Sequence, residues 1–148
     1  MIRHAIAKDI PAIMDMVREF YANTDYAKFA PFDEDTVQAL AELITFQHIM
    51  IVATDDSDTP IGLLALMLSP LPYNRNILSC VEVAWWVKPE FRKSSLGVDM
   101  IRYADNIRKL RGATNFQMAR LSTSPEGLDS VYENLGFTFS EKYFSKVN

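Results

Sequence analysis

A short turn of small and basic residues separates a run of β-branched and aromatic residues from an amphipathic helical pattern. The apolar run ends before Pro89, and the turn extends from Arg92 to Gly97. The first N–H groups of a helix lack partners within the helix, and the helix dipole favours negative charge at that end. Arg92 and Lys93 would add attraction for phosphate. We therefore expect residues 92–97 to bind a phosphate-bearing ligand, the alternative being an ordinary solvated helix N-terminus.

A single carboxyl group lies within the apolar run that precedes this turn. Glu82 is the only acidic residue between Ile77 and Val87. Burial among apolar neighbours raises the pKa of a carboxyl, and a carboxylate with a raised pKa is suited to accept a proton from a reacting group. The alternative is a structural carboxylate that is paired with an arginine or exposed at a sheet edge. The sequence leaves both interpretations of Glu82 open.

The composition excludes several kinds of protein. The chain has 148 residues, a length that favours one domain spanning residues 1–148. Its formal net charge of −4 argues against a nucleic-acid-binding protein, whose surface is usually basic. A single cysteine, Cys80, rules out an internal disulfide. With only two histidines, His4 and His48, no metal site is expected.

No stretch of the sequence has the length and apolarity of a membrane span, and the N-terminus carries Arg3, Lys8 and Asp9 without a long apolar run behind them. We therefore expect a cytoplasmic protein that does not interact with membranes.

Hydrophobic periodicity predicts an α+β fold with a mixed, mostly antiparallel sheet. The expected order is strand, two helices, three strands, helix, strand, helix and a terminal hairpin. The unit spanning residues 77–121 is a strand, a helix and a strand, so its two strands should be parallel. The expected strands are 1–7, 49–53, 61–68, 77–87, 116–121, 137–139 and 143–147, and the expected helices begin after Asp9, near Asp33, after the turn at 92–97 and at Glu126.

Two segments in this order resemble motifs of the GNAT superfamily of acyl-CoA N-acyltransferases. Val87–Gly97 is similar to the pattern V-x-P-x-x-[RQ]-x-x-G-x-[GA], and Val131–Phe137 is similar to L-Y-x-x-x-G-F. The resemblance implies a GNAT-like sheet of six to seven strands with about four helices and a central strand-helix-strand cofactor unit. It also implies transfer of an acetyl group from acetyl-CoA to a primary amine by direct attack in a ternary complex.

The chain departs from the family pattern at two positions. Ser95 occupies the place of the first motif glycine, and serine tolerates unusual backbone angles less well. Ser124 and Pro125 lie where the family often has an asparagine, and proline lacks an N–H donor.

The resemblance implies that the turn wraps the pyrophosphate of coenzyme A through main-chain N–H groups, and that the strand edge at 84–87 pairs with the pantetheine arm. Trp85 and Trp86 are adjacent strand residues and so face opposite sides; the sequence does not show which lines the substrate pocket. The expected cofactor-binding residues are Trp86, Val87, Arg92, Lys93, Ser94, Ser95, Leu96, Gly97 and Val98.

The resemblance makes Tyr132 the expected catalytic acid, which donates a proton to the departing thiolate of coenzyme A. A phenol remains protonated at neutral pH and can hydrogen-bond to sulfur. Glu82, directly or through a water molecule, is the expected base for the amine, while strand backbone near Trp86 and Val87 polarises the carbonyl. The alternative for Tyr132 is a helix tyrosine packed on the sheet.

Two questions about function stay open at this point. The acceptor is a small-molecule or peptide amine, and the acidic balance suits a cationic one. A protein from another class, a non-catalytic GNAT-fold module that binds coenzyme A or a protein partner, is the alternative. Strand edges of two subunits often pair into dimers in this family, so the resemblance also implies a possible homodimer.

Overall fold

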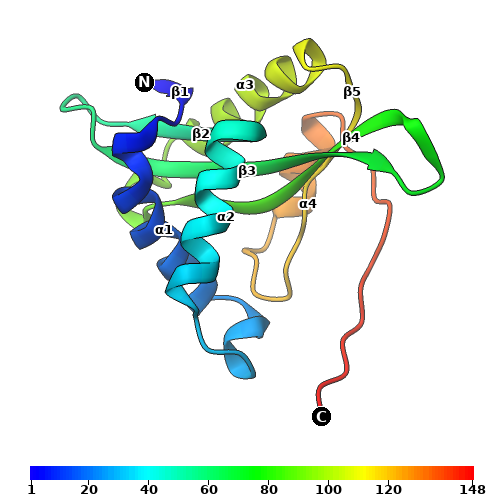
Figure 1. The fold of residues 1–148 in the computed structure, drawn as a ribbon, viewed down its shortest axis with the longest axis horizontal. Helices are drawn as coiled ribbons and strands as arrows, with labels where there is room; N and C mark the ends of the chain where they lie inside the picture. The colour runs from blue at the N-terminus through cyan, green and yellow to red at the C-terminus, as the bar shows by residue number, and fades with distance from the viewer.

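The fold is organised around a twisted five-stranded sheet, seen in the computed structural model that describes all 148 residues (Figure 1). The strand order is β1-β2-β3-β4-β5; the first three pairings are antiparallel, and β4 and β5 are parallel. The strands are β1 (Ile2–His4), β2 (Ile49–Thr54), β3 (Pro60–Leu71), β4 (Asn74–Val87) and β5 (Ala113–Gln117), and the helices are α1 (Ile10–Ala22), α2 (Glu34–Gln47), α3 (Leu96–Leu110) and α4 (Leu128–Asn134).

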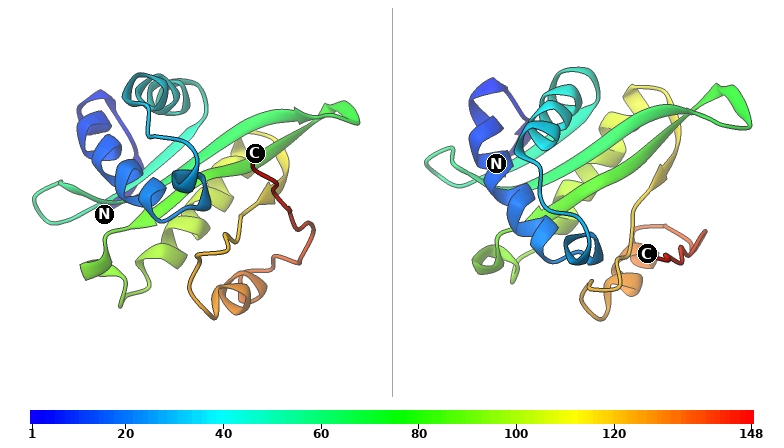
Figure 2. Two further views of the ribbon diagram at one scale, coloured as in Figure 1. Left: turned by 90° about the horizontal axis from the view of Figure 1, so that it is seen from below. Right: turned by 60° about the horizontal axis from the view of Figure 1, so that its bottom comes forward.

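Helices cover both faces of the sheet, so the core has two parts (Figure 2). On one face α1 and α2 pack through residues such as Ile13, Met16 and Ile44 against the sheet. On the other face α3 and α4 pack through residues such as Met100, Ile101 and Tyr132. Strand β2 is buried along its whole length, which is why its sequence is a continuous apolar run.

The third helix and the two strands that flank it form the expected strand-helix-strand unit. β4 leads through a single 3₁₀ turn, Pro89–Phe91, into α3, which returns to the parallel strand β5. Gly112 follows α3 with a φ of 82°, the left-handed conformation that ends many helices. This unit places the turn at 92–97 beside the end of β4.

The β3–β4 hairpin is longer than the sequence predicted. β3 continues through Pro70 to Leu71, and Ser69 and Pro70 pair with Ser79 and Leu78. The ladder continues past Pro70 to the pairing of Leu71 with Asn74, with a register irregularity between Pro70 and Leu71. The expected strand 61–68 stopped before Pro70, but the one N–H donor lost at Pro70 does not end a ladder at the outer end of a hairpin.

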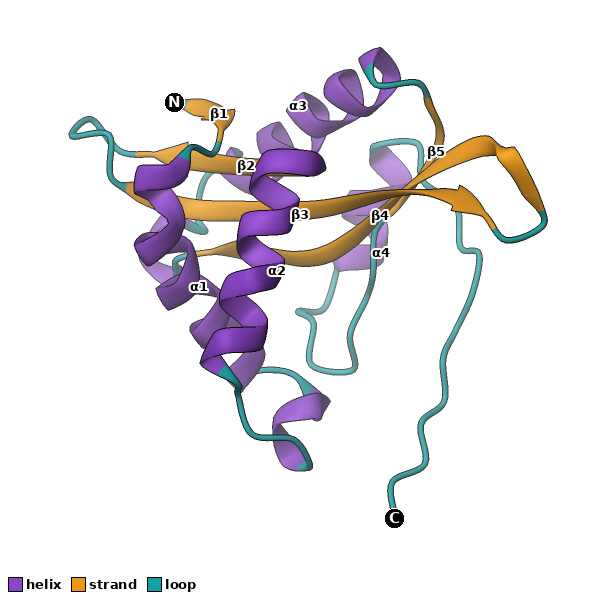
Figure 3. Ribbon diagram, viewed as in Figure 1, coloured by secondary structure: helices purple, strands orange, loops and turns teal.

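The expected sheet of six to seven strands is wrong: the sheet has five, and the terminal hairpin is absent. Residues 137–147 contain no strand, and the chain beyond α4 runs away from the sheet as an irregular segment (Figure 3). The pattern of residues there does favour strands. A strand, however, needs a neighbour to satisfy its backbone, and no part of the same chain pairs with this segment.

Candidate active site

The two parallel strands β4 and β5 separate at the point where the expected site begins. β4 pairs with β5 only from Leu78 to Val81, but it pairs with β3 as far as Val87. From Glu82 onward, β4 therefore has an unpaired edge facing β5. In this V-shaped notch, the main-chain groups of β4 have no strand partner at the position where a ligand could add as a strand.

The carbonyl oxygen of Val87 is a main-chain acceptor whose direction follows from the plane of its peptide bond. The N–H of Lys88 donates to the carbonyl oxygen of Ile61 in β3 at 2.9 Å. Because the peptide is planar and trans, the carbonyl of Val87 points the opposite way, away from β3 and into the notch. Arg92 Nε donates to this oxygen at 2.7 Å, so Arg92 links the turn to the strand end.

A β-bulge in β4 decides which way the two tryptophans face. Ala65 pairs with Ala84 and Leu66 pairs with Glu82, so Val83 is the extra residue. Trp85 packs against the core on the α3 and α4 face, whereas Trp86 packs against α1 and α2. The expected opposite facing is confirmed, and Trp85 is the one on the α3 side.

Trp85 lies directly beneath the first turn of α3. A Cβ added at Gly97 would meet Trp85 Cζ2 at 2.9 Å, so only glycine fits this position without displacing the indole. The indole Nε1 of Trp85 is buried without a hydrogen-bond partner. A buried, unpaired donor is costly, so this N–H under the turn fits a site that accepts a polar ligand.

The serine at position 95 needs no glycine-like backbone. Ser95 has φ −75° and ψ 1°, and Asp58, far from this turn, is the sole non-glycine residue with positive φ. Its hydroxyl donates to Asp99 Oδ2 at 2.6 Å. Ser94 Oγ donates to the carbonyl of Phe91 at 2.9 Å and accepts from Leu96 N–H at 3.3 Å. The departure from the glycine motif is therefore compatible with the turn.

The basic residues of the turn differ in their surroundings. The guanidinium of Arg92 stacks over the Trp86 ring, 4.1 Å from its centroid, and Trp86 Nε1 donates to Glu19 Oε2 at 2.9 Å. Lys93 is exposed and forms no ion pair. Arg92 thus has a structural role at the notch, while Lys93 is available to an anion.

The two expected catalytic residues meet at one residue of the loop after β5. Glu82 Oε2 accepts from the N–H of Ala119 at 2.6 Å, and Tyr132 Oη donates to the carbonyl of Ala119 at 2.7 Å. Tyr132 reaches this point from α4, where its ring also lies against Trp85 and Phe137. The structure therefore brings Glu82 and Tyr132 together at the mouth of the notch.

Burial changes the acidity of both groups. Desolvation raises the pKa of the Glu82 carboxyl to about 7, against the opposing effect of the Ala119 N–H bond. Desolvation, with smaller contributions from the charges of Glu82 and Asp129, raises the pKa of the Tyr132 phenol well above its usual value. Near neutral pH, Glu82 can therefore accept a proton while Tyr132 retains one.

A hollow of about 520 Å³ lies on the α1 side of this strand end. Its wall combines the last turns of α1 with the end of β4 and the turn that follows. The lining residues are Glu19, Ala22, Asn23, Trp86, Lys88, Pro89, Glu90 and Arg92.

Two residues of the site were not singled out from the sequence. Ala119 acts through its main chain, which side-chain patterns do not report. Glu19 is one of several polar residues on the outer face of α1, and nothing in its spacing marks it. The structure also gives the expected substitute for the family asparagine a local role: Ser124 Oγ accepts from Leu121 N–H at 2.9 Å, within its own loop.

No group of three or more His, Cys, Asp or Glu side chains is arranged to hold a metal ion. None of the helices combines the length and apolarity needed to cross a membrane.

No family model and no curated protein matches the chain, whereas many solved structures share its fold. A transcriptional regulator from Bacillus halodurans C-125 is 21% identical with a TM-score of 0.78, covering 100% of this chain and 99% of that one. A Trypanosoma brucei acetyltransferase is 17% identical with a TM-score of 0.74, covering 100% and 99%.

A predicted acetyltransferase from Clostridium acetobutylicum, crystallised with acetyl-CoA, is 14% identical with a TM-score of 0.76, covering 99% of this chain and 95% of that one. Identities this low speak for the fold alone. The similar structures are mostly described as acetyltransferases and are matched over almost their whole length, so the chain shares the fold of these proteins, a GNAT-like α+β fold.

Proposed function

We propose that this protein is an N-acetyltransferase that moves an acetyl group from acetyl-CoA to a primary amine by direct attack in a ternary complex. The observation that carries the proposal is the meeting of Glu82 and Tyr132 at Ala119. One group has a pKa near neutrality and the other remains protonated, which is the pairing that acyl transfer to an amine requires.

The cofactor would be bound by the turn and the strand edge. The N–H groups at the start of α3 and the exposed Lys93 would hold the pyrophosphate. The edge of β4 from Glu82 to Val87, which is not paired with β5, would pair with the pantetheine arm as an added strand does. Ser95 supports this arrangement because its backbone needs no positive φ.

In the proposed reaction, Glu82 accepts a proton from the acceptor amine, directly or through a water molecule. The amine nitrogen then attacks the thioester carbon, forming the N–C bond. Strand backbone near Trp86 and Val87 polarises the carbonyl oxygen during the attack. The C–S bond breaks, Tyr132 gives its proton to the thiolate, and solvent returns the proton from Glu82 to Tyr132.

The acceptor would enter from the hollow on the α1 side. The carboxylates of Glu19 and Glu90 line it, as does the indole of Trp86, and these groups suit the ammonium form of an approaching amine. Lys88 and Arg92 line the same wall, and their positive charges suit an acceptor that also carries a negative group. A small-molecule or peptide amine remains the proposed class, and the cytoplasm the proposed location.

The test is release of the coenzyme A thiol from acetyl-CoA in the presence of a panel of amines. The panel comprises polyamines, free amino acids, aminoglycosides and peptides with free N-termini or lysines. We expect one class to raise thiol release above the background hydrolysis, with mass spectrometry finding the acetylated amine. Thiol release that no amine stimulates would contradict the proposal.

The runner-up is a non-catalytic module of the same fold, which binds coenzyme A or a protein partner. One observation favours it: the similar structure from Bacillus halodurans is described as a transcriptional regulator. Binding of acetyl-CoA without turnover on the whole panel would favour this second function.

A further inference from the structure

Two side chains of opposite charge are held by one indole at the wall of the hollow beside β4. Trp86 Nε1 donates to Glu19 Oε2 at 2.9 Å, and the guanidinium of Arg92 stacks over the Trp86 ring, 4.1 Å from its centroid. Glu19 comes from α1, and Arg92 from the turn after β4. The hollow thus holds a carboxylate at the edge and a guanidinium over the face of the same ring.

Both of these side chains keep unused hydrogen-bonding capacity. The Glu19 carboxylate accepts only at Oε2, and the Arg92 side chain donates only through Nε, to the Val87 carbonyl at 2.7 Å. Neither residue forms an ion pair. The two terminal NH₂ groups of a guanidinium match the two oxygens of a carboxylate, and a carboxylate oxygen accepts from an ammonium. The pair can therefore receive a ligand that carries both charges.

The rest of the hollow balances these charges instead of adding to one sign. Lys88 and Glu90 also line it, and neither of them forms an ion pair. A polyamine would bring its ammonium groups toward Lys88 and Arg92, and a purely anionic ligand would meet Glu19 and Glu90. A zwitterionic ligand matches both signs, so complementarity of charge favours it.

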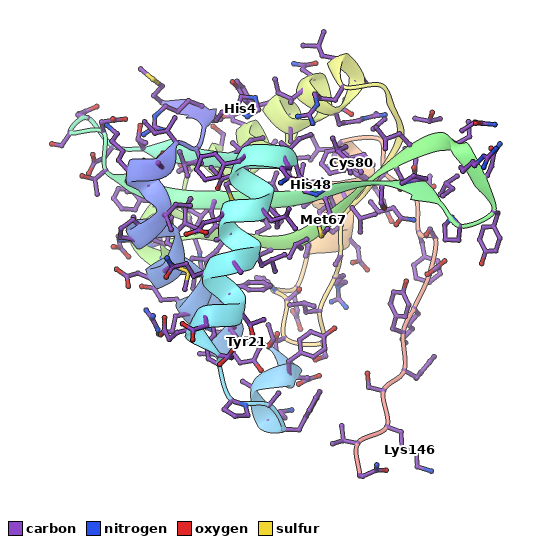
Figure 4. All side chains as sticks on the ribbon, viewed as in Figure 1. His4, Tyr21, His48, Met67, Cys80 and Lys146 are labelled. Atoms are coloured by element: carbon purple, nitrogen blue, oxygen red, sulfur yellow. The ribbon has the colours of Figure 1, made fainter.

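The α1 side of the hollow is fixed before any ligand binds. The last turns of α1, marked by Tyr21 in Figure 4, are tied to the loop that follows, because Tyr21 Oη donates to the carbonyl of Ala30 at 2.5 Å. Asn23, which also lines the hollow, donates through Nδ2 to the carbonyl of Glu19 at 2.8 Å. Binding groups that are already positioned lose less conformational entropy when a ligand arrives.

The distance along β4 decides which nitrogen of such a ligand could react. Glu82, the proposed base, and Val87, to which Arg92 is bonded, are five positions apart, or roughly 13–17 Å at about 3.3 Å per residue. An amine next to a carboxylate held by Arg92 would stop well short of Glu82. An amine at the end of a chain of several methylenes would extend toward Glu82, with a water molecule completing the path.

We propose that the acceptor is a free diamino acid of the length of lysine, bound by its α-amino group at Glu19 and by its α-carboxylate at Arg92. This inference rests on the proposed acetyl transfer. The distal amine gives its proton to Glu82 and forms the amide bond, and the thiolate leaves with the proton of Tyr132. Glu19 and Arg92 are then specificity-determining residues, which contact the acceptor but take no part in making or breaking bonds.

The first test measures binding without turnover, with coenzyme A present to fill the cofactor site without donating an acetyl group. The chain has two tryptophans, so an isotope-labelled sample gives two indole N–H signals by NMR, and Trp85→Phe assigns them. We expect lysine to shift the Trp86 signal with a millimolar Kd. Cadaverine, which lacks the carboxylate, and ε-aminocaproate, which lacks the α-amino group, should bind about tenfold more weakly. Equal or absent shifts with all three ligands would overturn the inference.

The second test compares acetyl transfer to the same three amines. We expect kcat/KM to be about tenfold higher for lysine than for either truncated amine, with the acetyl group on the distal nitrogen by mass spectrometry. Arg92→Gln should remove the preference for lysine over cadaverine, and Glu19→Gln the preference over ε-aminocaproate. Arg75→Gln and Glu42→Gln remove exposed charges outside the hollow, so these matched controls should keep both preferences.

The outcomes separate this inference from the proposed function. Acetylation of other amines without a preference for lysine, or a preference that survives both Arg92→Gln and Glu19→Gln, would overturn the inference and leave acetyl transfer standing. An acetyl group on the α-nitrogen would also overturn it. Binding of lysine at Trp86 without acetylation of any amine would contradict acetyl transfer, while the site for a zwitterionic ligand would stand.

Discussion

Glu82 and Tyr132 are hydrogen-bonded to the two polar main-chain groups of one residue. Glu82 accepts from the N–H of Ala119 at 2.6 Å, and Tyr132 donates to its carbonyl at 2.7 Å. Glu82 comes from β4 and Tyr132 from α4, fifty positions apart in the chain. The loop after β5 thus holds the proposed base and the proposed acid close to each other.

Tyr132→Phe tests the acid. Removal of the phenol should lower kcat by about 10²–10⁴-fold, because the thiolate would leave without a proton donor. The KM for acetyl-CoA should change little, since the ring and its packing against Trp85 remain. Thiol release with a fixed amine measures both quantities.

Tyr103→Phe is the matched control, because Tyr103 is a half-buried tyrosine on α3 outside the notch. It should retain full turnover. Equal turnover by the wild type and Tyr132→Phe with the cognate amine would show that the acid role is wrong.

Glu82→Gln tests the base through the pH dependence of kcat/KM. Burial raises the pKa of Glu82 to about 7, so the wild-type rate should fall about tenfold per pH unit below that value as the carboxylate becomes protonated. Glutamine can still accept the Ala119 N–H but cannot take a proton. The variant should be slow and should lack this inflection; an unchanged acidic limb in the variant would assign the inflection to another group.

The same substitution should change stability in a pH-dependent manner. The Glu82 pKa is raised from 4.5 to about 7, so the unfolded chain ionises first as the pH rises. Below both pKa values the carboxyl is neutral in the folded and the unfolded chain, so burial of the carboxyl carries no charge penalty. Above about pH 7 the buried carboxylate is charged, and its burial lowers the free energy of unfolding by on the order of 3 kcal/mol.

Relative to the wild type, Glu82→Gln should therefore gain free energy of unfolding between about pH 4 and pH 8. Urea denaturation at the two pH values measures the gain. A difference between the two proteins that is the same at both pH values would contradict the burial of this carboxyl.

Gly97→Ala tests the close approach of Trp85 to α3. The new Cβ would lie 2.9 Å from Trp85 Cζ2, so the turn or the indole must move, at a cost of about 1–3 kcal/mol. Both the melting temperature and the affinity for acetyl-CoA should fall. Trp85→Phe in the same chain should restore part of the stability by making room for the Cβ.

Ser95→Gly is the matched control in the same turn. Because Ser95 has an ordinary negative φ, glycine gains nothing there, and the affinity for acetyl-CoA should change little. A large increase in affinity would show that the serine disturbs the turn in a way that its backbone angles do not reveal.

Hydrophobic periodicity and turn residues predicted most of the fold, because local sequence patterns determine most of its helices and strands. The four helices, the hairpin of β2 and β3, and the parallel pairing of β4 with β5 are confirmed. The terminal hairpin failed for a physical reason. The segment from Phe137 to Val147 has a strand pattern, but a pattern cannot supply the neighbouring strand that it needs.

The sequence also indicated that Glu82 and Tyr132 could act together, but not how. Both side chains hydrogen-bond to the main chain of Ala119, and the type of a residue does not show where its main-chain groups lie. The facing of Trp85 and Trp86 depended on the bulge at Val83, which a strict alternation cannot locate. Gly97 was read as a motif glycine, and its contact with Trp85 gives the reason that a glycine is needed.

Calorimetric titration of acetyl-CoA into the full chain is the decisive measurement, because every proposed step needs the cofactor at the notch. We predict a single site per chain with a Kd of about 1–100 μM, in the usual range for a cofactor substrate. We also predict weaker binding by Gly97→Ala. No binding at millimolar acetyl-CoA would contradict the proposed acetyl transfer.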